Sequence, residues 1–491
     1  MAPDGLASRF TETASRYPKR IALSTSSGQV SYGELLADAR RVAHALAATG
    51  IHTPAAITVS RTRASVTAIL GAILAGVPYA PVDAAYPESR LRFMLDDLAA
   101  AIHIDGTGSE PVIHRSDSPA RAQRIPPDAI YVLYTSGSTG VPKGCVVTDR
   151  NVLSLFDATR EEFQPSHHDV SAVLHSLAFD FSVWETWSSW LYGGTCWLAE
   201  PDVVRDPDRL SAGLEAHQVT RLSATPSLFT YLAAALIRRG YVLPRLRSLV
   251  LGGEAVCLPD VARFLSARCA PDVRVVNMYG ITETTVHVTF RELSGSETGG
   301  RPTSTPIGLP IPSLRLSLRD QQGAPVQPGA PGELWVSGAG TCAGYLNRPE
   351  LTAERFVADD QAVTWYRSGD LARYDGGEYH YLGRLDRQVQ LRGHRIELGE
   401  VEAVLETFDE VEKAVAAVEA RPATGRPALV AYVKTSGPPD AVTVKDIKAK
   451  ARRVLPPQAV PQTVHLVAQL PMNQHGKLDM AELRAAVARR R

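Results

Sequence analysis

Helix-like and strand-like patterns of apolar and polar residues alternate through most of the chain. Residues 31–47 carry apolar side chains three and four positions apart, which predicts an amphipathic helix. Ser31, followed by Glu34, is typical of a helix start. The apolar run 66–82 contains Gly71, Gly76 and two prolines, which favours a buried helix running into a strand over a membrane span.

Short apolar runs that end in glycine, at 247–253 and 273–280, predict buried strands that open into loops. Such alternation of helices and strands indicates an α/β fold, in which ligands bind at the carboxyl ends of the strands. From about Ser294 the chain becomes loop-rich, with turns between short β-strands. We therefore expect a large N-terminal domain over 1–385, made of α/β subdomains plus a β-rich subdomain, and a small α+β C-terminal domain over 386–491.

Composition narrows the function classes. The 491 residues include 52 basic and 52 acidic side chains, so no global field recruits nucleic acid or an anionic membrane. The five cysteines are scattered and form no CxxC pair, which argues against a disulfide framework and a zinc site and fits a reducing compartment. The N-terminus has no apolar segment of signal-peptide length, and we expect a cytoplasmic protein.

The segment YTSGSTGVPKG, residues 134–144, follows an apolar run and is suited to binding an anion. Glycine turns present successive backbone N–H groups, to which hydroxyls and a mobile lysine add donors. The spacing differs from the GxxxxGK[ST] of a P-loop, and the alternative of a solvated linker is disfavoured by the preceding strand. The predicted phosphate-binding residues are Thr135, Ser136, Gly137, Ser138, Thr139, Gly140 and Lys143.

Eight further segments, together with this loop, span nearly the whole chain. In this order they resemble the motifs of the adenylate-forming superfamily of acyl-CoA synthetases, luciferases and nonribosomal peptide synthetase adenylation domains, and most closely its amino-acid-activating branch. The segments are VSYGEL (30–35), LAGVPYAPVD (74–83), FDFSVWE (179–185), NMYGITETT (277–285), GELWVSGAGTCAGYLNRPELTAERF (332–356), YRSGDL (366–371), GRLDRQVQLRGHRIELGEVE (383–402) and HGKLD (475–479).

The resemblance implies that an amino acid and ATP react to aminoacyl-adenylate and pyrophosphate, with ATP and Mg²⁺ as the expected cofactors. Positioning and charge neutralisation would then carry most of the rate. Lys477 resembles the lysine that bridges the carboxylate and the α-phosphate, although His475 stands where the family pattern usually has Asn. Glu283 resembles the magnesium ligand, and Thr282 a donor to the α-phosphate.

The same resemblance assigns the nucleoside contacts and a hinge. Tyr279 would stack on adenine, Asp370 would accept the ribose hydroxyls, and Arg384 would contact phosphate or ribose. A carboxylate suits a vicinal diol because it only accepts hydrogen bonds. Asp386 resembles the hinge about which the C-terminal domain moves as a lid, with a second orientation for thioester formation.

Asp180 resembles the aspartate that pairs with the α-ammonium group in amino-acid activators. The substrates of fatty acyl and aryl activators have no ammonium group, so a buried carboxylate at this position would stay unpaired and would be costly. The pattern is similar to that of threonine activators, which usually have Asn at the position of Ser223 and Ile at that of Val250. The remaining side-chain pocket implied by the resemblance is Phe181, Trp184, Ser223, Val250, Gly252, Met278, Val286 and His287.

Several alternatives stay open. If His287 does not contact a substrate hydroxyl, valine and 2-aminobutyrate are substrates alongside threonine. The competing functions are an acyl- or aryl-CoA ligase and a non-enzymatic nucleotide-binding module. No LGGxS-type carrier motif follows HGKLD, so a carrier protein is expected in trans. The sequence does not decide whether a small activator protein is needed.

Overall fold

The computed structural model describes residues 5–51, 53–115, 125–136, 141–296, 304–421, 426–436, 443–471 and 480–489. The chain forms two compact units. The larger comprises Met1–Ala84, Leu95–Thr135 and Lys143–Leu385, and the smaller Ala85–Met94, Ser136–Pro142 and Asp386–Arg491. Within the described part of the chain, no helix has the length and apolar composition needed to cross a membrane.

Among the described residues, the larger unit contains a 14-stranded sheet in the order β16-β17-β19-β20-β15-β14-β13-β12-β11-β9-β10-β1-β2, with β18 paired to β19. Its strands are β1 (Ile21–Thr25), β2 (Gly28–Ser31), β9 (Val170–Val173), β10 (Thr195–Leu198), β11 (Arg221–Ala224), β12 (Ser248–Gly252), β13 (Arg274–Tyr279), β14 (Thr289–Leu293), β15 (Thr305–Pro310), β16 (Leu314–Arg319), β17 (Gly332–Gly338), β18 (Phe356–Ala358), β19 (Thr364–Asp375) and β20 (Glu378–Arg384).

Pairing in this sheet changes direction at β13. Strands β1, β10, β9, β11, β12 and β13 pair in parallel, whereas β13 and all later pairs are antiparallel. The antiparallel part is the β-rich subdomain expected after residue 294. The predicted fold class, α/β with an added β-rich region, is confirmed.

A second sheet of the larger unit ends in the predicted anion-binding loop. Strands β7 and β8 are antiparallel, and Thr135 lies opposite Lys143, so the two ends of the loop are held together by a β-hairpin. The order of the sheet is β6-β5-β3-β4-β7-β8. Its strands are β3 (Ala55–Val59), β4 (Tyr79–Asp83), β5 (Ile102–Asp105), β6 (Val112–Arg115), β7 (Ala129–Thr135) and β8 (Lys143–Thr148).

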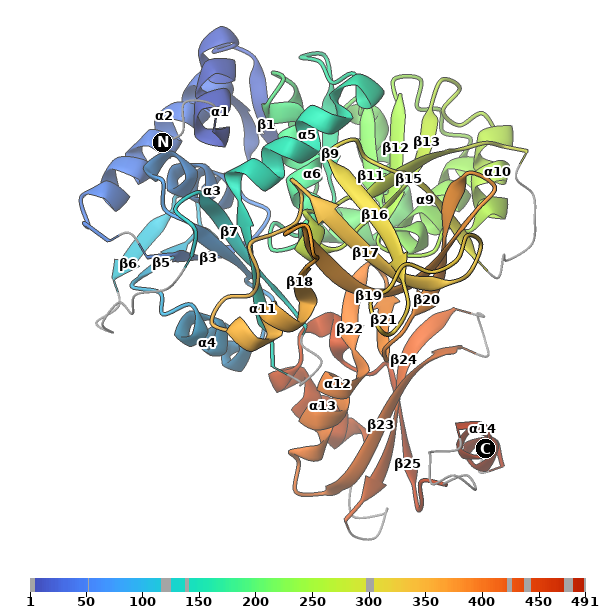
Figure 1. Ribbon diagram of the computed structural model, residues 1–491. Coiled ribbons are helices and arrows are strands. Elements are labelled where there is room, and N and C mark those ends of the chain that lie inside the picture. Colours follow the sequence, from blue (N-terminus) through green and yellow to red (C-terminus); the bar gives the residue numbers. More distant parts are fainter. Residues whose placement is uncertain are drawn as a thin grey trace. The chain divides into compact units, whose positions relative to one another are not determined.

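Helices cover these sheets. Figure 1 shows α9 and α10 beside strands β11–β13, where Phe229 and Phe264 belong to one apolar core. Ser31 caps α2 in a capping box with Glu34, which confirms that predicted helix start. The helices are α1 (Leu6–Arg16), α2 (Tyr32–Ala47), α3 (Arg63–Ala75), α4 (Glu88–Asp97), α5 (Asp149–Phe163), α6 (Phe181–Trp190), α7 (Pro201–Arg205), α8 (Pro207–Ala216), α9 (Pro226–Arg239), α10 (Leu258–Ser266), α11 (Pro349–Arg355) and the 3₁₀ turn η1 (Thr282–Thr284).

The smaller unit has its own core. Val401 and Leu405 of one helix pack with Leu429 of the central strand and Ile447 of the next helix. Its small size and mixed pattern fit the α+β domain expected from the sequence. Its elements are β21 (Gln388–Leu391), β22 (His394–Glu397), α12 (Leu398–Glu406), β23 (Val411–Ala420), β24 (Pro427–Thr435), α13 (Val444–Val454), η3 (Pro457–Ala459), β25 (Thr463–Val467) and α14 (Met480–Ala488).

Candidate active site

The strands of the β7–β8 hairpin hold two of the predicted phosphate contacts, Thr135 at the end of β7 and Lys143 at the start of β8. The Oγ1 atom of Thr135, at the end of β7, is buried and has no hydrogen-bond partner among the described residues. A buried hydroxyl without a partner is costly unless a ligand satisfies it. Ser136 donates from Oγ to the carbonyl of Arg395 at 3.0 Å, within the smaller unit.

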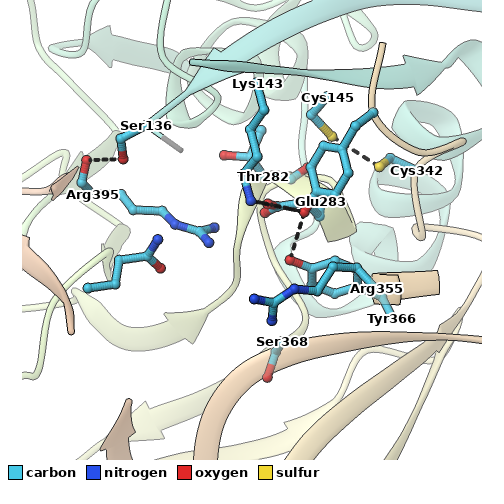
Figure 2. Close-up of polar contacts among 12 residues, drawn as sticks. Ser136, Lys143, Cys145, Thr282, Glu283, Cys342, Arg355, Tyr366, Ser368 and Arg395 are labelled. Carbon is cyan, nitrogen blue, oxygen red and sulfur yellow. Dashed lines mark hydrogen bonds and ion pairs between the residues drawn. The ribbon is translucent and has the colours of Figure 1, made fainter. Parts of the chain in front are cut away.

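Lys143, expected from the sequence to be a mobile positive charge, is buried and paired. It is 8% exposed, and its Nζ lies 3.3 Å from Oε1 of Glu283 (Figure 2). The same nitrogen donates to the hydroxyl of Tyr345 at 3.1 Å. Since β8 begins at this lysine, its side chain enters the interior from the first residue of a fully buried strand.

Glu283 lies in η1 and is completely buried. The hydroxyl of Tyr345 donates to its Oε1 at 2.8 Å, and the main-chain N–H of Cys342 donates to its carbonyl at 3.0 Å. Magnesium bound with a nucleotide takes one or two carboxylates together with phosphate oxygens and waters. Glu283 is a single buried carboxylate beside the ammonium group of Lys143, and it therefore fits the predicted role of a magnesium ligand.

The predicted nucleoside contacts form a connected group. Tyr279, at the end of β13, donates from its hydroxyl to Oδ2 of Asp370 in β19. Arg384 of β20 donates to Oδ1 of Asp370 at 2.8 Å, because the two residues lie opposite each other on paired strands. The predicted ribose acceptor is thus already engaged on both oxygens. A carboxylate offers about four acceptor positions, so these bonds are compatible with further hydroxyl donors.

Asp180 precedes α6 and is buried. Its Oδ2 accepts from the hydroxyl of Thr282 at 2.5 Å. Burial raises the pKa of the Asp180 carboxyl above its ordinary value, against the opposing effect of that hydrogen bond. Among the described residues, no lysine or arginine lies within ion-pair distance of Asp180. The predicted α-phosphate donor and the predicted ammonium partner therefore contact each other directly.

The predicted side-chain pocket is assembled around His287. The rings of Phe181 and Trp184 each lie edge-on to its imidazole, with centroids 5.1 Å away. A methyl group at Gly252 would lie 3.6 Å from the imidazole, so the absence of a side chain there leaves space. Burial lowers the pKa of His287 to about 3, and neither ring nitrogen has a hydrogen-bond partner among the described residues.

Three parallel strands supply the other wall. Ser223 of β11 and Val250 of β12 are register partners, and Met278 of β13 lies opposite Gly252. Ser223, Val250 and Trp184 line a buried cavity of about 10 Å³, the size that holds one water molecule. The cavity also borders Arg221 and Ser248 at the starts of β11 and β12, so it extends toward the N-terminal ends of these strands.

Val286, also predicted for the pocket, has a strained backbone with φ of 70°. A positive φ is a real outlier for a β-branched residue, and such strain is found at ligand sites. This segment packs closely against the end of β13, since a Cβ at Gly280 would lie only 2.0 Å from the carbonyl oxygen of Val286.

Some predicted residues lie outside the described part of the chain. They are Lys477 and the loop residues Gly137, Ser138, Thr139 and Gly140. Asp386 is described within the smaller unit, where its Oδ1 accepts from the N–H of Gln388 at 3.1 Å.

Four further residues of the site were not predicted from the sequence, namely Tyr345, Tyr366 and the pair His175 and Glu185. His175 stacks on Phe181 at 4.6 Å, and its Nδ1 lies 2.8 Å from Oε1 of the buried Glu185. No local pattern marks these residues. The sequence signal that could have found three of them is their place inside family-like motifs, since Tyr345, Tyr366 and Glu185 lie in the segments 332–356, 366–371 and 179–185.

Two family models match the chain. The AMP-binding enzyme model covers residues 10–346, and the AMP-binding enzyme C-terminal domain model covers residues 400–477.

Curated relatives agree with these matches. The chain is 37% identical to a dimodular nonribosomal peptide synthase of Bacillus subtilis (strain 168), over 98% of this chain and 21% of that protein. It is 36% identical to syringomycin synthase SyrB1 of Pseudomonas syringae pv. syringae, over 98% of this chain and 81% of that protein. The chain thus spans about a fifth of the length of the dimodular relative.

Among solved structures, the chain is similar to holo-PA1221, described as a nonribosomal peptide synthetase protein with adenylation and peptidyl carrier domains. The TM-score is 0.82 at 28% identity, covering 99% of this chain and 84% of that one.

Proposed function

Because the chain belongs to the AMP-binding enzyme family and is an AMP-forming ligase of the adenylation-domain type, we propose that it activates a small α-amino acid. The amino acid and ATP would give aminoacyl-AMP and pyrophosphate. The aminoacyl group would then pass to the phosphopantetheine thiol of a carrier protein in trans. Threonine is the proposed substrate, with valine and 2-aminobutyrate as the alternatives.

The observation that carries this proposal is the buried carboxylate of Asp180. A carboxylate in the interior needs a cation or enough hydrogen-bond donors to offset its lost hydration. The hydroxyl of Thr282 is a neutral donor, and no lysine or arginine of the described chain pairs with Asp180. An α-ammonium group supplies the missing positive charge, whereas an acyl or aryl acid does not.

The same contact gives Thr282 two successive roles. Its hydroxyl has a single proton, which it donates to Asp180 in this structure. Once an ammonium group pairs with Asp180, that proton is available to the α-phosphate oxygen. Amino-acid binding would thereby release a donor for the adenylation step.

The proposal of threonine rests on the polar groups in a pocket that is otherwise apolar. His287 has two buried nitrogens without partners, and Ser223 adds a hydroxyl at the edge of the small cavity. Phe181, Trp184 and Met278 would narrow and shorten the pocket, which favours a short side chain. A hydroxyl that bonds to His287 would satisfy a polar atom that valine leaves unpaired.

Charge neutralisation would come from both units. We assign Glu283 to Mg²⁺, which when bound neutralises charge on the triphosphate. Lys477 would bridge the carboxylate and the α-phosphate as the new bond forms. Tyr279 would contact adenine, and Asp370 with Arg384 would hold the ribose. The β7–β8 hairpin, with Thr135, Ser136 and Lys143, would bind the phosphates.

The carrier protein is proposed from the relatives. PA1221 is described as containing adenylation and carrier domains. The proposed hinge at Asp386 would let the C-terminal domain serve first adenylation and then thioester formation. A small activator protein is a further partner to be tested by adding it to the assay.

The test is amino-acid-dependent ATP–pyrophosphate exchange with threonine, valine, 2-aminobutyrate and serine. Exchange with threonine at least ~10²-fold above valine indicates a bond to the hydroxyl, and equal rates indicate a pocket that reads size alone. Asp180→Asn should abolish exchange because it removes the negative charge facing the ammonium group. If none of the amino acids supports pyrophosphate exchange, with or without an activator protein, the proposal is rejected. Product formation only in the presence of coenzyme A would identify a CoA ligase.

A further inference from the structure

The hydroxyl of Tyr345 lies between two groups of the proposed phosphate end of the site. It donates to Oε1 of Glu283 at 2.8 Å and accepts from Nζ of Lys143 at 3.1 Å. The hydroxyl of Tyr366 lies 3.2 Å from it. Tyr345 and Tyr366 are 5% and 1% exposed, so water does not compete for these bonds. Figure 2 shows the side chains of Lys143 and Glu283 converging, with Tyr366 nearby.

The direction of each hydrogen bond follows from chemistry. An ionised carboxylate only accepts, and a lysine ammonium only donates. The single proton of the Tyr345 hydroxyl must therefore point to Glu283, while its lone pairs face Lys143. Tyr366 then donates to Tyr345. Replacing Tyr345 by a residue without a hydroxyl would leave both the carboxylate oxygen and the ammonium group with one partner fewer.

We propose that Tyr345 is a positioning residue that orients the carboxylate of Glu283 for a divalent cation bound with the nucleotide. This inference rests on the proposed function, in which Glu283 holds Mg²⁺. Tyr345 would act through Glu283, to which its hydroxyl donates. By fixing Oε1 against the ammonium group of Lys143, it sets the orientation in which the carboxylate meets the cation and keeps Lys143 at the same point.

The fold explains why this residue can take the role. An antiparallel bridge joins Cys145 of β8 to Tyr345, and the N–H of Val146 donates to the carbonyl of Gly344 at 3.0 Å. The main-chain N–H of Tyr345 donates to the hydroxyl of Thr352 at 3.0 Å. Both the backbone and the ring are thus held rigidly, and hydrogen-bonded partners of a metal ligand work best when they cannot move.

The experiment measures cation binding without turnover. Mn²⁺ is titrated into the purified chain with α,β-methylene ATP, and bound Mn²⁺ is measured by electron paramagnetic resonance. Tyr345→Phe keeps the ring and removes the hydroxyl, and it should weaken Mn²⁺ binding by about 10- to 100-fold, the usual effect of losing such a partner. Tyr32→Phe is the matched control, because Tyr32 is fully buried and its hydroxyl donates to the carbonyl of Gly194, away from this cluster.

Two further variants separate positioning from general packing. Tyr366→Phe leaves the bond from Tyr345 to Glu283 in place and should change the Mn²⁺ dissociation constant by less than about threefold. In a Glu283→Gln background, Tyr345→Phe should have no further effect on Mn²⁺ binding, because the residue acts through that carboxylate.

Unchanged Mn²⁺ affinity in Tyr345→Phe would overturn the inference, and so would an equal loss in Tyr32→Phe. Neither amino acid nor carrier protein enters this assay. A chain that binds Mn²⁺ with the nucleotide analogue and responds as expected, yet activates no amino acid, would leave Tyr345 in its role and reject only the proposed substrate. A wild-type chain that binds no Mn²⁺ with the analogue would reject both the assignment of Glu283 and the role of Tyr345.

Discussion

His287 places a titratable ring in an apolar pocket, and this makes stability depend on pH. Its pKa is about 3 in the folded chain and about 6.5 in the unfolded chain. Above pH 6.5 both states are neutral, so stability is full. As the pH falls below 6.5, His287 is protonated in the unfolded chain but stays neutral in the folded chain. The free energy of unfolding therefore decreases until the pH reaches about 3. Between pH 7 and pH 5 this amounts to about 2 kcal/mol.

The measurement is urea unfolding of the wild type and of His287→Leu at both pH values. Other groups titrate in both proteins, so the difference between them isolates His287. The wild type should lose about 2 kcal/mol more than the variant on going to pH 5. Parallel pH profiles would mean that the imidazole is not kept neutral by burial.

Gly280 allows the strained segment around Val286 to approach β13. Because a Cβ at Gly280 would meet the carbonyl oxygen of Val286 at 2.0 Å and the Cα of His287 at 2.6 Å, backbone would have to shift. Gly280→Ala should therefore destabilise the fold by about 1–3 kcal/mol and displace His287. We expect a lower melting temperature together with weaker threonine selectivity in pyrophosphate exchange. Gly108→Ala, where φ is not positive and a new Cβ would lie 3.8 Å from the nearest atom, controls for the loss of a glycine alone.

At the scale of elements, Asp169 joins the N-terminal ends of three neighbouring strands. It lies just before β9, completely buried, and pairs with Arg221 of β11 at 3.0 Å and with Arg247 before β12 at 2.5 Å. Burial acts to raise the pKa of Asp169, but Arg221 and several hydrogen bonds outweigh it, and the net pKa is lowered. Its stabilisation is therefore present above the unfolded pKa and is lost as the pH falls through the lower, folded value.

Asp169→Asn should cost about 3–5 kcal/mol, because it leaves the buried guanidinium of Arg221 without its carboxylate. Chemical unfolding at pH 7 gives the value. Asp202→Asn breaks an exposed pair with Arg209 and should have little effect, since solvent screens surface ion pairs. Equal costs for the two variants would contradict the distinction between buried and exposed pairs.

The local sequence pattern was sufficient to predict helices and strands, but it was insufficient to predict the side-chain contacts between them. Ser31 and Glu34 predict their helix start because both halves of a capping box lie within one turn. The hydrogen-bonded cluster of Lys143, Glu283 and Tyr345 joins residues up to 202 positions apart in the sequence. It depends on the β-bridge between Cys145 and Tyr345, which no local sequence pattern specifies. Lys143 was expected to be mobile for this reason. Thr282 and Asp180 were each assigned a ligand, but their mutual hydrogen bond needs α6 and η1 to be placed together.

At the scale of the whole molecule, the proposed chemistry is divided between the two units. Asp180, Glu283 and Asp370 belong to the larger unit, whereas Lys477 lies in the sequence of the C-terminal segment. A residue of the C-terminal segment can take part in adenylate formation and take no part in the later transfer to the carrier protein. This division predicts that the two half-reactions respond differently to one substitution.

Lys477→Ala should slow aminoacyl-adenylate formation by about 100-fold or more, since it removes positive charge where negative charge develops in the transition state. Transfer of the aminoacyl group from supplied adenylate to a carrier protein needs no such charge at the α-phosphate and should keep its rate. Pyrophosphate exchange measures the first step and carrier-bound thioester the second. Lys413→Ala removes an exposed lysine paired with Glu406 in the same unit and should alter neither. Equal losses in both steps would mean that Lys477 supports the fold or the carrier surface and not the adenylation step alone.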